Sequence, residues 1–190
     1  MHYEIHITVL TPNIEQFKND CSYIGVKPIV IETQNKKNEF EQQVMTSSKY
    51  EDAHYIVRLI NLSKQLKSLG YKILRQKVEI KPEYNKHNLH KYYETHLRIK
   101  YPKNESNENL KRFCSHTKFH LSKNLFKVDK EFNYQLLTFR TSDMSYDQFY
   151  DYVEKSLDCL KNAYHYNYDK IEIEEAILDT NIDIDKNWLN

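Results

Sequence analysis

Two histidines, each set in the same four-residue pattern, are the residues of this chain best suited to chemistry. The pattern Tyr-Glu-x-His spans Tyr3–His6 and returns at Tyr93–His96. Histidine exchanges protons near neutral pH, so one member of a pair can act as a base and the other as an acid. Thr8 adds a hydroxyl group shortly after the first histidine. We therefore predict that His6, His96 and Thr8 are catalytic.

Cationic and polar side chains that can hold an anion occur on the strands expected near these histidines. The chain has only 2 glycines, which excludes the glycine-rich loops that bring backbone N–H groups to a phosphate. Side chains must therefore bind any phosphate group. The predicted ligand-binding residues are Lys77, Arg98, Ser122, Asn124, Arg140 and Lys170.

Three kinds of chemistry stay open for these residues. The histidines, with cations holding the phosphate, can act on a phosphoester. Alternatively, His6 and His96 with Glu79 and Glu172 offer the ligand types of a divalent-metal site. Their spacing selects no metal, so no metal ligand is predicted and the cofactor is left unknown. In the third alternative the cations bind an anion or nucleotide without chemistry, and whether the chain is an enzyme stays open.

The segments that carry these residues occur twice. Gln43–Thr46 corresponds to Gln135–Thr138 at a spacing of 92 residues, and Lys77–Ile80 corresponds to Lys170–Ile173 at a spacing of 93. The Tyr-Glu-x-His pattern itself recurs at a spacing of 90. Three ordered matches at a nearly constant spacing indicate an internal duplication.

Each copy is predicted to contain the same series of strands and helices. Apolar–polar alternation marks the strands, and apolar residues at helical spacing mark two helices between them. Ser48–Glu51 and Ser145–Gln148 have the spacing of capping boxes, and Gly25 and Gly70 are expected to end helices. The order β-α-β-β-α-β, twice, is the ferredoxin-like pattern. We therefore predict an α+β fold of two tandem ferredoxin-like (βαββαβ) repeats related by a pseudo-twofold axis, with antiparallel sheets and helices on one face.

The predicted boundaries follow from this duplication: residues 1–81 form the first repeat, 82–91 a linker, 92–178 the second repeat and 179–190 a C-terminal tail. Alternation places both histidines on the sheet faces that the helices leave open. These polar faces are solvated surfaces crossed by Lys–Glu pairs, a polar interface between the repeats, or the two walls of a shared cleft.

The first histidine motif resembles that of the two-histidine phosphoesterases, which carry two H-x-[ST] motifs on a pseudosymmetric bilobal fold. His6–Thr8 fits the motif, whereas His96–Arg98 departs from it at the third position. His120–Ser122 fits the motif but lies on a different predicted strand of the repeat. The resemblance implies a phosphoesterase activity.

The C-terminal tail resembles the ending of an uncharacterised bacterial and viral family, whose members end in Asp-Ser/Thr-Asn, Leu-Asp and Gly-Trp-Leu. Here the tail runs from Asp179 to Leu189, and Ser122–Asn124 and Thr138–Arg140 resemble the Ser-Arg-Asn and Thr-Leu-Arg stretches of that family. This implies a shared fold and site without naming a substrate. Trp188 is expected either to pack back on the body or to help the tail close over the cleft. The departures from the family pattern are Lys123, Ile184 and Asn187.

Composition narrows the classes of partner. Lys and Arg number 28 and Asp and Glu 27, so a nucleic-acid partner is not expected. No apolar run approaches the roughly 20 residues of a membrane span, and we expect a cytoplasmic or intracellular protein. The expected function is to bind or act on a phosphorylated or nucleotide-like ligand in a polar cleft between the repeats. A non-catalytic interaction or oligomerisation module is the alternative, and the oligomeric state is unknown.

Overall fold

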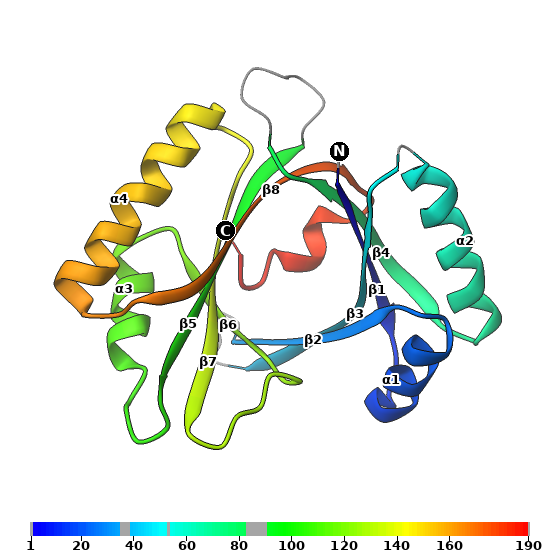
Figure 1. The fold of residues 1–190 in the computed structure, drawn as a ribbon, viewed down its shortest axis with the longest axis horizontal. Coiled ribbons are helices and arrows are strands. Elements are labelled where there is room, and N and C mark those ends of the chain that lie inside the picture. Colours follow the sequence, from blue (N-terminus) through cyan, green and yellow to red (C-terminus); the bar gives the residue numbers. More distant parts are fainter. Residues whose placement is uncertain (1, 35–38, 53, 83–90, 190) are drawn as a thin grey trace.

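The chain forms one closed antiparallel β-barrel with helices packed against its outside (Figure 1). The computed structural model describes residues 2–34, 39–52, 54–82 and 91–189. Within them the elements are β1 (Tyr3–Leu10), α1 (Ile14–Tyr23), β2 (Lys27–Gln34), β3 (Phe40–Tyr50), α2 (Tyr55–Ser68), β4 (Lys72–Ile80), β5 (Tyr92–Pro102), α3 (Glu108–His116), β6 (His120–Asn124), β7 (Phe132–Thr141), α4 (Tyr146–Tyr164), β8 (Tyr168–Asp179) and the 3-10 helix η1 (Ile182–Asp185).

The predicted order of strands and helices along the chain is confirmed, but the predicted fold of two tandem ferredoxin-like repeats is wrong. The strands follow one another around the barrel in the order β1-β3-β2-β6-β7-β5-β8-β4. Two seams join the halves: β2 pairs with β6 and β4 pairs with β8. Edge strands present unpaired N–H and C=O groups, and closure of a barrel satisfies them. The two open sheets of the prediction therefore do not exist.

Hydrophobic residues on the outer face of the barrel pack against the helices. Ile5 and Ile7 of β1 are fully buried in a cluster with Phe17 of α1. In the second half, Leu97 of β5 lies in an equivalent cluster with Phe149 of α4. Full burial of such a side chain contributes about 1.5–3 kcal/mol. Because side chains alternate along a strand, this outer packing turns the neighbouring polar residues toward the barrel interior.

The helix boundaries confirm one of the two predicted capping boxes. The Ser145 hydroxyl accepts a hydrogen bond from the backbone of Gln148, and the Gln148 side chain accepts one from the backbone of Ser145. The capping box predicted at Ser48 is wrong, because Ser48 lies within β3 opposite Ile5. The following helix begins only at Tyr55 and has no side-chain cap.

Most of the predicted linker, residues 82–91, lies outside the described residues. None of the helices in the described part of the chain has both the length and the apolar character needed to cross a membrane.

Candidate functional site

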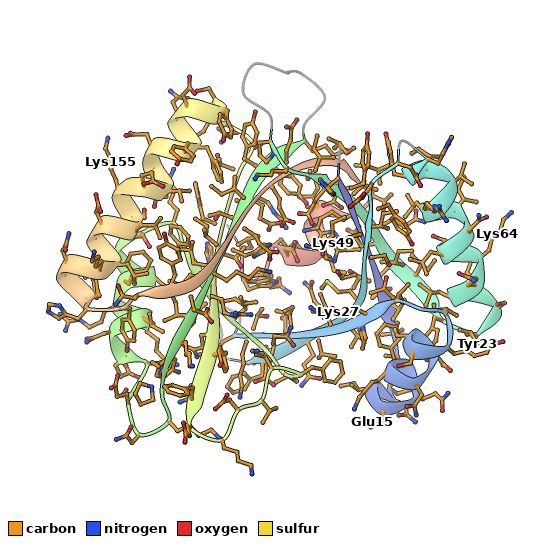
Figure 2. The ribbon with its side chains drawn as sticks, viewed as in Figure 1. Glu15, Tyr23, Lys27, Lys49, Lys64 and Lys155 are labelled. Atoms are coloured by element: carbon orange, nitrogen blue, oxygen red, sulfur yellow. The ribbon has the colours of Figure 1, made fainter. Side chains whose placement is uncertain are left out.

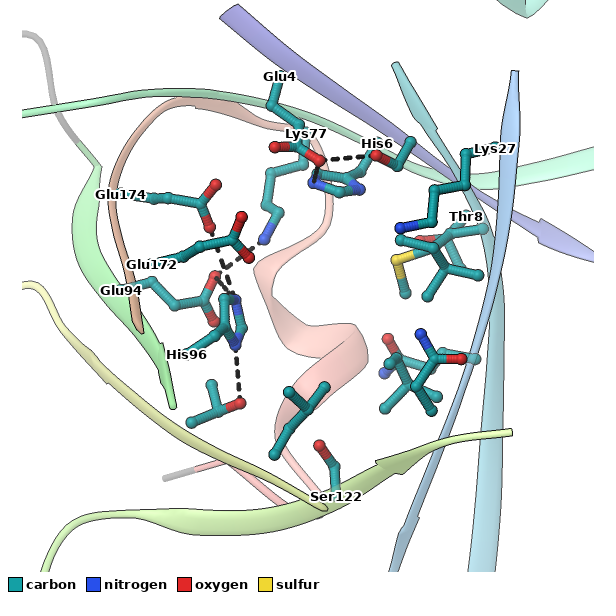
Figure 3. Close-up of a pocket in the computed structure, with 18 of the residues that line it drawn as sticks. Glu4, His6, Thr8, Lys27, Lys77, Glu94, His96, Ser122, Glu172 and Glu174 are labelled. Atoms are coloured by element: carbon teal, nitrogen blue, oxygen red, sulfur yellow. Dashed lines mark hydrogen bonds and ion pairs between the residues drawn. The ribbon is translucent and has the colours of Figure 1, made fainter. Parts of the chain in front are cut away.

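The barrel interior contains a cavity of about 680 Å³ (Figure 3). Closure of the barrel turns the inner faces of the two halves toward one another, so His6 and His96 line the same cavity. Their roles as catalytic or binding groups remain predictions. The structure brings all nine predicted site residues to the wall of this cavity: His6, Thr8, Lys77, His96, Arg98, Ser122, Asn124, Arg140 and Lys170.

A buried network of ion pairs forms the wall made by β4, β5 and β7. The Lys77 ammonium lies 2.7 Å from Glu79 Oε1 and 2.8 Å from Glu94 Oε2. Glu94 Oε1 also accepts a hydrogen bond of 2.8 Å from Arg140. Burying single charges is very unfavourable, and only mutual pairing makes such a network stable. Although burial opposes the shift, Arg140 and Lys77 hold the pKa of Glu94 well below its usual value.

The first predicted catalytic histidine, His6, is engaged at both ring nitrogens. Its Nε2 lies 3.1 Å from Glu79 Oε2 and 3.4 Å from Glu4 Oε1. Its Nδ1 lies 3.2 Å from the carbonyl oxygen of Thr46. All three neighbouring atoms are oxygens, so the His6 ring is held in place from both of its nitrogens.

The second predicted catalytic histidine, His96, lies among carboxylates. Its Nδ1 is 2.9 Å from the Thr138 hydroxyl, and its Nε2 is 3.7 Å from Glu94 and 3.8 Å from Glu174. Burial alone would lower the pKa of His96, but these carboxylates raise it to about 9. A protonated imidazole can donate a proton or hold an anion, but it cannot act as a base.

Four exposed lysines line the cavity and mark its mouth: Lys27, Lys49, Lys127 and Lys170. Figure 2 shows Lys27 and Lys49 at the opening of the barrel. Lys49 lies 2.9 Å from Glu4, and Lys170 lies 2.7 Å from Glu172. Within the described ranges, Lys27 and Lys127 have no carboxylate within 4.0 Å, and Lys127 sits 4.8 Å from the centre of the Tyr134 ring.

The wall opposite the ion pairs is mostly neutral. Figure 3 shows Glu94, Glu172 and Glu174 on one side of the cavity, facing Thr8 and Ser122 across it. The aromatic rings of Tyr50, Phe126, Tyr134 and Trp188 also line the cavity, and such flat surfaces can stack against a ring of a ligand. The apolar and aromatic residues of the lining include Ile29, Ile31, Met45, Leu136, Phe126, Tyr134 and Trp188.

The C-terminal tail turns into the barrel and closes part of the cavity (Figure 1). The Asp185 carboxylate is 2% exposed and lies 2.9 Å from Arg75 and 2.7 Å from Arg140. It also accepts a hydrogen bond of 2.7 Å from Gln43. The tail therefore packs against the body and, through Asp185 and Trp188, also forms part of the cavity wall.

Sequence reasoning missed several residues of the cavity, although signals for some of them were present. Arg75 stands two positions before Lys77 on β4, so alternation places both on the inner face. Glu94 is part of the repeated motif itself. Lys27 begins β2 and alternates with Ile29 and Ile31, which line the same cavity, whereas Lys127 follows the end of β6 and no strand pattern places it.

The geometry gives no support to the divalent-metal alternative. Across the described part of the chain, no group of three or more His, Cys, Asp or Glu residues is arranged to hold a metal ion. The carboxylates instead form ion pairs with lysines: Lys77 pairs with one oxygen of Glu79, and Lys170 pairs with one oxygen of Glu172.

Comparisons with known proteins assign no family. No family model matches the chain, and no curated protein matches its sequence. The chain is similar to the small subunit of acetolactate synthase from Thermotoga maritima, with 13% identity over 95% of this chain and 96% of that one and a TM-score of 0.34. It is similar to a heme-binding protein from Thermus thermophilus, with 9% identity over 92% of this chain and 90% of that one and a TM-score of 0.30. It is similar to a mutant chlorite dismutase from Candidatus Nitrospira defluvii, with 8% identity over 92% of this chain and 91% of that one and a TM-score of 0.31.

These similarities are too low to carry an argument about function. The comparisons also give no support to the resemblance of the tail or to that of the histidine motifs. The expectation of a phosphoesterase is therefore corrected: His6–Thr8 is a motif match within a barrel strand, and the carboxylates around His96 raise the pKa of that ring to about 9, so it is not a base at neutral pH.

Proposed function

We propose that the barrel interior binds a small anionic organic ligand of the phosphorylated or nucleotide-like kind. The observation that carries this proposal is the pair of exposed lysines, Lys27 and Lys127, that line the cavity with no carboxylate within 4.0 Å among the described residues, although Lys127 acts on Asp169 at longer range. The other cations of the cavity are neutralised within the protein. These two are available to a ligand from solution.

The volume and lining of the cavity support a ligand with an anionic group at one end and an aromatic ring at the other. A volume of about 680 Å³ lies within the range of roughly 300–1,000 Å³ that small-molecule sites occupy. A phosphoryl group fits the lysines at the mouth, because several cations share its charge and donate to its oxygens. An aromatic or heterocyclic ring fits the apolar wall, where Tyr134, Phe126 and Trp188 offer stacking surfaces.

Calorimetric titration with adenosine 5′-monophosphate and with adenosine tests this proposal. We expect the nucleotide to bind and the nucleoside to bind at least ~10-fold more weakly, because only the nucleotide contacts the lysines. The double variant Lys27→Ala with Lys127→Ala should weaken nucleotide binding by ~10-fold or more. The matched control is Lys64→Ala with Lys161→Ala, on the outer surfaces of α2 and α4. Equal binding of nucleotide and nucleoside, or no binding of either, contradicts the proposal.

The alternative of a non-catalytic interaction module retains one supporting observation. The outer face of α2 leaves Ile56, Val57 and Ile60 between 42% and 53% exposed. Sedimentation analysis of the wild-type chain and of Ile56→Ser with Ile60→Ser tests it. A concentration-dependent assembly that the double variant abolishes supports a self-association role, and a monomer at all concentrations removes this support.

A further inference from the structure

Glu174 differs from the other glutamates of the cavity in its lack of a lysine or arginine partner. Its closest ion-pair partner among the described residues is His96, whose Nε2 lies 3.8 Å from Glu174 Oε2. Each of the other three that line the cavity has an ammonium group within 3 Å: Glu4 with Lys49 at 2.9 Å, Glu94 with Lys77 at 2.8 Å and Glu172 with Lys170 at 2.7 Å, and the buried Glu79 beside them has Lys77 at 2.7 Å.

The surroundings of Glu174 have too few cations for the carboxylates present. Glu94 lies directly opposite Glu174 in the β5–β8 ladder, and Figure 3 shows the Glu172 carboxyl beside it. Burial, reinforced by the charge of Glu79, raises the pKa of Glu174 well above its usual value. The charged and titratable groups around it are Glu172 on β8, Glu94 and His96 on β5, Lys77 and Glu79 on β4, Glu4 on β1 and Lys49 on β3.

The Glu174 side chain is nevertheless positioned for a ligand rather than for packing. It is 14% exposed and lines the cavity. The cation within 4.0 Å of the Glu174 carboxyl group among the described residues is the His96 ring, which Glu94 shares. Glu174 therefore has a longer ion pair than its neighbours, and a positive group that arrives from outside would offset the excess of carboxylates around it.

We propose that Glu174 receives a protonated amine of the ligand, so that the cavity selects molecules that carry both an anionic group and an ammonium group. This inference rests on the proposed function, since it places the anionic group at the lysines of the mouth. It deepens that function by adding a second recognition point deep in the barrel. Glu174 is then the residue that determines specificity between ligands with and without an amine.

Pyridoxamine 5′-phosphate and pyridoxine 5′-phosphate are matched probes for this inference. They share the ring and the phosphate, and differ in an ammonium group against a hydroxyl. We expect the amine to bind about tenfold more tightly, as one charge-assisted hydrogen bond provides.

The variant Glu174→Gln separates recognition of the amine from recognition of the phosphate, because glutamine keeps the size of a carboxyl group without its charge. It should remove the preference for the amine, while pyridoxine phosphate binds as before. The matched control is Glu154→Gln on the exposed surface of α4. If the two probes bind equally well to the wild-type chain, the inference fails while the proposed function stands. If neither probe binds, both fail. A preference that survives in Glu174→Gln also overturns the inference.

Discussion

The two Tyr-Glu-x-His strands place the same residue types at different depths of burial. In β5, Glu94 is 1% exposed and its partner Lys77 is 7% exposed, so the pair belongs to the barrel interior. In β1, the Glu4 side chain is 15% exposed and its partner Lys49 is 65% exposed, so the pair lies at the mouth. The repeated motif thus provides one buried charge cluster inside the barrel and one charge cluster that is exposed to solvent.

This difference shows how a duplicated pattern acquires two roles without a change of residues. The tail contributes to it, because Asp185 adds a further buried carboxylate next to Arg140 in the interior cluster. No corresponding group from the described part of the tail pairs with Glu4 or Lys49 at the mouth. The interior cluster should therefore dominate stability, and the mouth should be open to substitution.

Removal of the interior lysine has the largest expected effect. Lys77→Met leaves Glu79 and Glu94 buried with one shared cation fewer, and loss of one partner from a buried pair costs about 3–5 kcal/mol. Urea unfolding, followed by circular dichroism, measures the change. Because a domain has only about 5–15 kcal/mol of stability, a variant that does not fold agrees with the expectation. A variant as stable as the wild type would show that the interior pairs contribute nothing.

Titration of His96 is expected to give the second largest effect. Because its pKa is raised from 6.5 to about 9, the protonated ring stabilises the fold fully below pH 6.5. This stabilisation is lost as the pH rises through about 9, with a total on the order of 3 kcal/mol. Unfolding free energies measured from pH 6 to pH 10 should fall in the wild type and fall less in His96→Gln. The exposed residue His2 provides the control His2→Gln, which should follow the wild type. Equal slopes for wild type and His96→Gln would exclude a charged His96.

The smallest effect is expected at the mouth. Lys49→Met removes a lysine that solvent already screens, and exposed ion pairs contribute about 0–1 kcal/mol. The same urea experiment should therefore give nearly the wild-type midpoint. A loss comparable with that of Lys77→Met would mean that the mouth and the interior are one coupled network.

Strand alternation was enough to predict the inner face of the barrel but not its closure. The pattern of β1 and β5 placed His6 and His96 away from the helices, and both line the cavity. Alternation within one strand carries no information about which edge strand pairs with which, so the β2–β6 and β4–β8 seams were missed. The sequence therefore predicted two open faces where the structure has one enclosed space.

The remaining errors have local causes. Ser48 has the spacing of a helix cap, but the ladder with β1 extends β3 past it, and long-range pairing outweighed the local signal. The contact of Asp185 with Arg75 joins residues 110 positions apart, which local patterns do not reveal. Whether Lys27 and Glu174 form ion pairs depends on residues from several strands. The sequence does not show which of these residues lie close to them, so only the structure shows it.

The central claim is that one cavity inside the barrel takes a ligand between the mouth and the two histidines. Nuclear magnetic resonance of the His6 and His96 side chains and of the Trp188 indole N–H during titration with adenosine 5′-monophosphate tests it most directly. All three groups line the cavity, so their signals should shift together with one dissociation constant. Shifts confined to residues outside the barrel, with these three signals unchanged at saturation, would contradict the account.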